Sequence, residues 1–111
     1  MKVLCVERYH DHLNRLAHIL NEAGYEVLTA VSGEQAIALF AEQAIHGVLL
    51  EYDLPDRNGV AVREEMKRIK PEVPILLFSG VGPQTPVLLR FFDAYIRQQA
   101  SPESAFEDSQ P

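Results

Sequence analysis

Short apolar runs alternate with helical patterns along this chain, and the alternation limits the fold more than any other feature of the sequence. Apolar residues recur at helical spacing between the runs, for example at Leu13, Leu16 and Leu20. The runs are expected to be strands, and they are Lys2–Val6, Tyr25–Ala30, Val48–Leu50, Pro74–Phe78 and Ala94–Arg97. Continuous apolar strands that alternate with helices are typical of a parallel sheet covered on both faces. The sequence therefore predicts an α/β fold.

The length of the chain predicts a single domain, and topology rules limit the possible strand orders of its sheet. A chain of 111 residues is close to the usual size of a single domain. Right-handed strand–helix–strand connections leave few topologies, and the flavodoxin-like doubly wound sheet is common at this length. We therefore predict a flavodoxin-like doubly wound five-stranded parallel sheet in residues 1–100. Residues 101–111 form a polar, acidic tail with Ala105 and Phe106 as its apolar anchors, so the last helix is expected to be short or missing.

The composition excludes several classes of partner. The net charge of -6 argues against nucleic acid as a direct ligand, since such a protein needs a basic face. The single cysteine, Cys5, excludes a disulfide framework and fits a cytoplasmic location. No signal peptide begins the chain, and no apolar run reaches the length of a membrane span, so no membrane partner is expected.

Polar residues at the ends of the expected strands mark the candidate site. In open α/β sheets the functional site lies at the carboxyl ends of the strands. In chain order, the residues at these ends are Glu7, Arg8, Glu51, Ser79 and Gln98. No glycine-rich phosphate loop follows the first strand, which weighs against a small α/β nucleotide-binding or enzymatic domain.

The segment from Gly47 to Gly59 carries the most specific pattern. An apolar run ends at Glu51, Pro55 stands four residues later, and the final glycine stands eight residues after Glu51. This layout resembles the phosphoacceptor strand and loop of response regulator receiver domains in two-component signalling. Three further stretches extend the resemblance to about residues 1–100, and they are Lys2–Val6, Pro74–Gly80 and Asp93–Ile96.

The resemblance assigns family roles to the acidic positions. Receiver domains hold a magnesium ion with two acidic residues after the first strand, and these positions read Glu7 and Arg8 here. The phosphoacceptor aspartate is replaced by Glu51. Asp53 falls where the family offers a backbone carbonyl to the metal. If any metal binds, the resemblance gives Glu7, Glu51 and Asp53 as its ligands.

The resemblance also assigns the remaining family positions. The hydroxyl residue after the fourth strand is retained as Ser79, and the aromatic residue that rotates on activation is retained as Tyr95. The lysine that contacts the phosphoryl group in the family falls on Gln98.

These exchanges indicate a degenerate phosphorylation site. Magnesium is held by carboxylates, waters and phosphate, and Arg8 places a permanent positive charge at a ligand position. We therefore expect no cofactor, with magnesium binding weak at most. The extra methylene of Glu51 displaces the nucleophilic oxygen, and in-line transfer tolerates little displacement. Arg8 is expected to pair with Glu51 or Glu7 instead.

Three interpretations of Glu51 remain open at this point. In the first, Glu51 is a harmless carboxylate in a decayed site. In the second, its longer side chain holds Ser79 and Tyr95 in an active-like arrangement without phosphorylation. In the third, a ligand or a partner controls the domain in another way.

Taken together, the sequence predicts a non-enzymatic signalling or protein-interaction module that is not phosphorylated by the usual route. A genuine phosphoacceptor in a phosphorelay, using Glu51 or Asp53, is one alternative, and a small α/β nucleotide-binding or enzymatic domain is the other. The expected partner is a histidine kinase or a downstream signalling protein. A homodimer is also expected, through a face of the sheet that the short tail leaves uncovered.

Overall fold

Four parallel strands form one sheet in the order β2-β1-β3-β4. The structure is a computed structural model that describes residues 1–100, so the acidic tail at 101–111 lies outside the described residues. The strands are β1 (Lys2–Val6), β2 (Glu26–Ala30), β3 (Gly47–Glu51) and β4 (Ile75–Phe78). The first four predicted strands are therefore confirmed to within one residue at each end. The flavodoxin-like order, which apolar runs alone do not specify, places β2 and β4 at the two edges.

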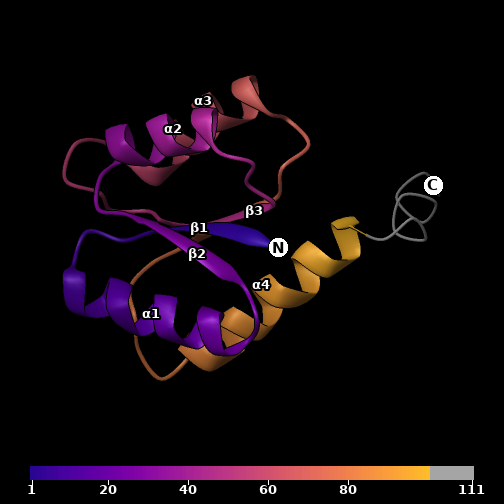
Figure 1. Cartoon of the computed structure of the whole chain (residues 1–111). Coiled ribbons are helices and arrows are strands. Elements are labelled where there is room, and N and C mark those ends of the chain that lie inside the picture. The colour runs from indigo at the N-terminus through magenta and orange to yellow at the C-terminus, as the bar shows by residue number, and fades with distance from the viewer. Residues whose placement is uncertain (101–111) are drawn as a thin grey trace, which may run out of the picture.

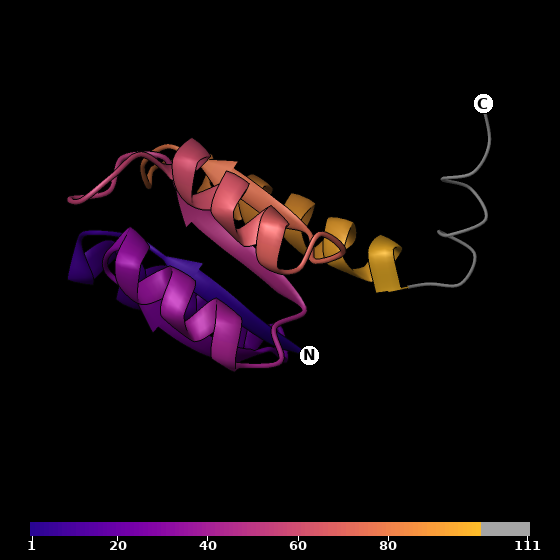
Figure 2. The same ribbon diagram turned by 90° about the horizontal axis from the view of Figure 1, so that it is seen from above.

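Helices cover both faces of the sheet (Figure 1). On one face lie α2 (Gly33–Glu42) and α3 (Gly59–Ile69), and on the other lie α1 (His10–Glu22) and α4 (Thr85–Ala100). Figure 2 shows the same layers from above, with α2 and α3 nearest the viewer. Among residues 1–100, none of these helices has both the length and the apolar character needed to span a membrane.

Two separate hydrophobic cores result from this layering. Successive side chains of a strand point to opposite faces of the sheet. In β1, Leu4 and Val6 pack with α2 and α3, whereas Val3 and Cys5 pack with α1 and α4. All four side chains are fully buried, which is why β1 reads as a continuous apolar run.

The predicted fifth strand is wrong. Residues Ala94–Arg97 lie inside α4, which is 16 residues long. Leu89, Phe92 and Ile96 are buried, and their spacing of three and four residues matches one face of a helix. This period runs through the segment without a turn, so helix formation buries all three side chains and a strand would not.

The expected short or missing last helix is not confirmed, because α4 covers the face beside α1. Ile96 approaches β3 so closely that a Cβ atom added to Gly47 would lie 2.5 Å from the Cδ1 atom of Ile96. Next to α1, the Tyr25 hydroxyl donates a hydrogen bond to Asp93, which also accepts one from Arg97 Nε at 3.0 Å. The helix α4 therefore covers part of the face that was expected to stay open, and the predicted dimer through this face is not confirmed.

Candidate functional site

The carboxyl ends of β1 and β3 bring two glutamates together. Val6 pairs with Leu50 in the sheet, so Glu7 and Glu51 continue neighbouring strands at the same level. Both side chains are buried, Glu7 to 1% exposure and Glu51 to 5%. Ser79 directly follows β4 at this end of the sheet, and its side chain is exposed. The structure thus places three predicted site residues at the carboxyl end of the sheet.

The Glu51 carboxylate binds a backbone N–H of the loop that follows β4. Its Oε1 and Oε2 atoms accept hydrogen bonds from the Gly80 N–H, at 3.3 and 3.1 Å. Gly80 has a φ of 75°, a left-handed conformation that residues other than glycine rarely adopt. We call this pair of contacts the Glu51–Gly80 clasp. It connects the end of β3 to the loop between β4 and α4.

The surroundings of Glu51 make its ionised form less favourable than that of a solvent-exposed glutamate. Burial raises the pKa of the Glu51 carboxyl above its usual value of 4.5, and the charges of Glu7 and Asp53 raise this pKa further. The Gly80 N–H opposes these effects but does not cancel them. Because the folded-state pKa lies above the unfolded one, protonation of Glu51 stabilises the fold. This contribution is fully present below about pH 4.5 and is lost as pH rises through the folded pKa.

The Glu7 carboxylate has a hydrogen-bond partner for only one of its two oxygens among the described residues. Its Oε1 atom accepts a hydrogen bond from the Tyr9 N–H at 3.1 Å and lies 3.8 Å from His12 Nδ1. Among the described residues, neither Glu7 Oε2 nor His12 Nδ1 has a hydrogen-bond partner. The loop after β1 therefore keeps a buried carboxylate oxygen unpaired.

Arg8 does not pair with either glutamate, so that expectation is wrong. Its guanidinium Nη1 lies 3.5 Å from Asp53 Oδ2, and its Cζ lies 5.2 Å from the centre of the Tyr9 ring. The Asp53 side chain is 72% exposed, and exposed ion pairs of this kind stabilise a fold by about 1 kcal/mol at most. Arg8 reaches outward because both glutamates are buried, whereas Asp53 and the Tyr9 ring are accessible from solvent.

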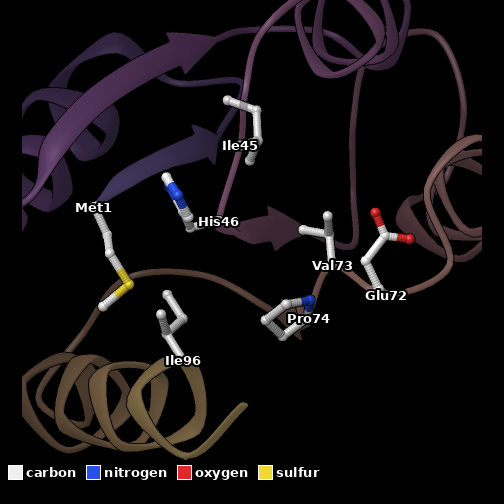
Figure 3. A pocket seen from close by; sticks show the side chains of 7 residues that line it. All are labelled: Met1, Ile45, His46, Glu72, Val73, Pro74 and Ile96. Atoms are coloured by element: carbon white, nitrogen blue, oxygen red, sulfur yellow. The ribbon is translucent and has the colours of Figure 1, made fainter. Parts of the chain in front are cut away.

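The placement of Gln98 at the carboxyl end of a fifth strand is also wrong, since Gln98 belongs to α4. Tyr95, which was expected to be grouped with Ser79 and Glu51, belongs to the same helix. The helix runs back across the sheet, and Ile96 lies beside Met1 and Pro74 at the amino ends of the strands (Figure 3). Gln98 is two residues further along and shares a shallow hollow with Tyr95. The structure therefore gives Gln98 no place in the candidate site, and Tyr95 no contact with Glu51.

Asp56 connects two elements near the site, and this role was not predicted from the sequence. It lies in the loop between β3 and α3. Its two carboxylate oxygens accept hydrogen bonds from the N–H groups of Gly33 and Glu34, both at 2.9 Å. These are unpaired donors at the start of α2, so Asp56 ties the loop after Glu51 to that helix. A partner 23 residues away leaves no local pattern in the sequence.

A family model described as a response regulator receiver domain matches residues 3–98. This chain belongs to that family. The receiver domain is 31% identical over 78 residues to the transcriptional regulatory protein ZraR of Escherichia coli, covering 70% of this chain and 18% of ZraR. It thus spans less than a fifth of that relative.

Solved receiver structures agree with the fold. A CheY-like receiver domain protein from Methanospirillum hungatei has a TM-score of 0.79 at 19% identity, covering 89% of this chain and 95% of that one, which supports the fold alone. The response regulator TrrA of Thermotoga maritima, in complex with the histidine kinase ThkA, has a TM-score of 0.68 at 28% identity. That match covers 73% of this receiver domain and 70% of that chain.

The receiver family implies a magnesium ion, but the residues at this site do not fit one. Two features of the described residues favour a cation, the unpaired Oε2 atom of Glu7 and the repulsion between the charges of Glu7, Glu51 and Asp53. Against it, both Glu51 oxygens accept the Gly80 N–H, and the Arg8 guanidinium stands beside Asp53. Within residues 1–100, no group of three or more His, Cys, Asp and Glu side chains is arranged to hold a metal ion. Magnesium needs near-octahedral oxygen ligands, which this set does not offer.

Proposed function

We propose that this receiver domain is a non-enzymatic signalling and protein-interaction module that is not phosphorylated by the usual route. The Glu51–Gly80 clasp carries the proposal. An acceptor carboxylate must present an oxygen in line with an incoming phosphoryl group, and small misplacements are costly. Here both oxygens of Glu51 face a backbone N–H of the same protein, and the side chain is 5% exposed.

The charges around Glu51 add to this argument. Phosphoryl transfer depends on cations that neutralise the developing negative charge. The nearest side chains that act on Glu51 are Glu7 and Asp53, and both raise its pKa because they are negative. Arg8 already lies against Asp53. A negative field at the acceptor position disfavours an anionic phosphodonor.

We infer that Glu51 instead biases the domain toward one conformation. The clasp fixes the loop that leads from β4 into α4, next to the exposed Ser79. A carboxylate that is always present would hold this loop without a phosphoryl signal. In this proposal, a protein partner binds the unphosphorylated domain in the conformation that Glu51 holds.

The partner we propose is a histidine kinase or a downstream signalling protein in the cytoplasm. Support comes from the related TrrA, whose structure was solved with a histidine kinase. The net charge of -6 favours a protein partner over nucleic acid, because a nucleic-acid-binding protein needs a basic face.

Treatment with acetyl phosphate and magnesium, followed by intact-mass measurement, tests the proposal. We expect the mass of the whole 111-residue chain to stay unchanged. A hydroxylamine-labile phosphoryl group that is absent from Glu51→Gln would contradict the proposal. A group absent from Asp53→Asn, but present in Glu51→Gln, would support the phosphorelay alternative with Asp53 as acceptor.

A further inference from the structure

Within the part of the chain that the structure describes, one side of the β4 backbone is unpaired. This strand lies at the edge of the sheet, and no other strand in residues 1–100 pairs with its outer side. The carbonyls of Pro74 and Phe78 accept hydrogen bonds from Val48 in β3 and from Tyr52 just after it, at 3.0 and 2.8 Å. Backbone groups point alternately to the two sides of a strand, so the N–H groups of Ile75 and Leu77 point outward. This edge is ready to pair with an extended strand.

The two edges of the sheet differ in how they resist such pairing. Natural proteins protect an exposed edge with charged residues, prolines or bulges. The β2 edge carries the exposed side chains of Glu26 and Thr29. The β4 edge consists of Ile75–Phe78, four apolar residues with no charge and no proline. Pairing is therefore favoured at β4 and opposed at β2.

One side of α4 adds apolar side chains beside this edge. α1 packs on β1 and β2, and α4 lies beside α1, where Tyr25, just after α1, donates a hydrogen bond to Asp93. Helical spacing places Leu88, Phe91 and Tyr95 on the opposite side of α4, toward the β4 end of the sheet. Phe91 is 67% exposed, whereas Leu88 and Tyr95 are half-buried. We call these three residues the α4 strip.

We propose that the β4 edge and the α4 strip form a homodimer interface, in which β4 pairs antiparallel with β4 of a second copy. A two-fold axis brings the same patch of both copies together, so each edge supplies the extended strand that the other lacks. The interface joins the sheets of the two copies into one continuous sheet, antiparallel at the β4–β4 pair, and places the two α4 strips side by side.

Charge favours a second copy over another occupant. The chain has a net charge of -6, yet the β4 edge and the α4 strip contain no charged residue. Two copies therefore meet at this patch without the like-charge repulsion that other faces would impose. A strongly basic or acidic partner gains nothing from an uncharged patch.

Sedimentation velocity on the full chain, over a dilution series, tests the proposal. We expect a reversible monomer–dimer equilibrium. Phe91→Glu should raise the dimer dissociation constant by about tenfold or more, because it buries an unpaired charge in the interface. Val60→Glu is the matched control, since Val60 is a 38% exposed valine on α3, and its dissociation constant should equal that of the wild type.

Amide hydrogen exchange supplies a readout that needs no variant. The Leu77 N–H should gain protection as protein concentration rises, whereas the Leu76 N–H, which points toward β3, should not change. A strict monomer at all concentrations would overturn the proposal. So would a dimer that Phe91→Glu does not weaken, or one in which exchange at Leu77 is independent of concentration.

Discussion

Phe92→Ala should lower the free energy of unfolding by about 3–5 kcal/mol, the usual cost of emptying a buried phenylalanine site. The Phe92 side chain is fully buried in the core shared by α1 and α4. It also lies near Gly47, so it helps to fix α4 against β3. Chemical denaturation at low protein concentration, where any dimer is dissociated, gives the measurement.

Phe91→Ala is the matched control, because the two phenylalanines are neighbours on the same helix. Phe91 is 67% exposed, so its truncation should change the free energy of unfolding by no more than about 0.5 kcal/mol. Equal effects of the two substitutions would mean that α4 does not present Phe92 to the sheet as described.

The double substitution Arg8→Asp with Glu51→Asp should raise the affinity for magnesium by about tenfold or more. Arg8→Asp replaces the cation beside Asp53 with a carboxylate next to Glu7. Glu51→Asp shortens the side chain that accepts the Gly80 N–H, which frees its oxygens from the clasp. Titration of the whole chain with magnesium, followed by calorimetry, measures the affinity.

Arg63→Asp makes the same charge change on the exposed surface of α3, away from the site. It controls for the general effect of adding negative charge to the chain. If the double variant binds magnesium no more tightly than Arg63→Asp, the acidic pocket differs from the family in more than these two residues.

The sequence predicts the sheet well because its strands are buried on both faces. Runs such as Val48–Leu50 contain no polar residue of the kind that an amphipathic helix would show, and all three side chains are fully buried. The segment Ala94–Arg97 was different, because it was predicted as a short apolar strand while its apolar period continues that of a helix. Burial of Leu89, Phe92 and Ile96 on one face decided the outcome.

The site could be predicted only where it follows directly from strand ends. Glu7, Glu51 and Ser79 lie at one edge because neighbouring parallel strands end there. Tyr95 and Gln98 were misplaced together with the fifth strand. The clasp involves the backbone of Gly80 in a left-handed conformation, and the partners of Asp56 are backbone groups of another helix. Contacts to a backbone far away in the sequence leave no local residue pattern, so these contacts could not be predicted.

The amide resonance of Gly80, followed by NMR as a function of pH, tests the central role of Glu51 most directly. A hydrogen bond to the carboxylate makes this amide report on the ionisation of Glu51. We predict a titration with a midpoint above the usual 4.5, because burial and the neighbouring carboxylates raise the pKa of Glu51. The same resonance should not titrate in Glu51→Gln. A Gly80 amide that is insensitive to pH in the wild type would contradict the clasp, and a midpoint at or below 4.5 would contradict the raised pKa of Glu51.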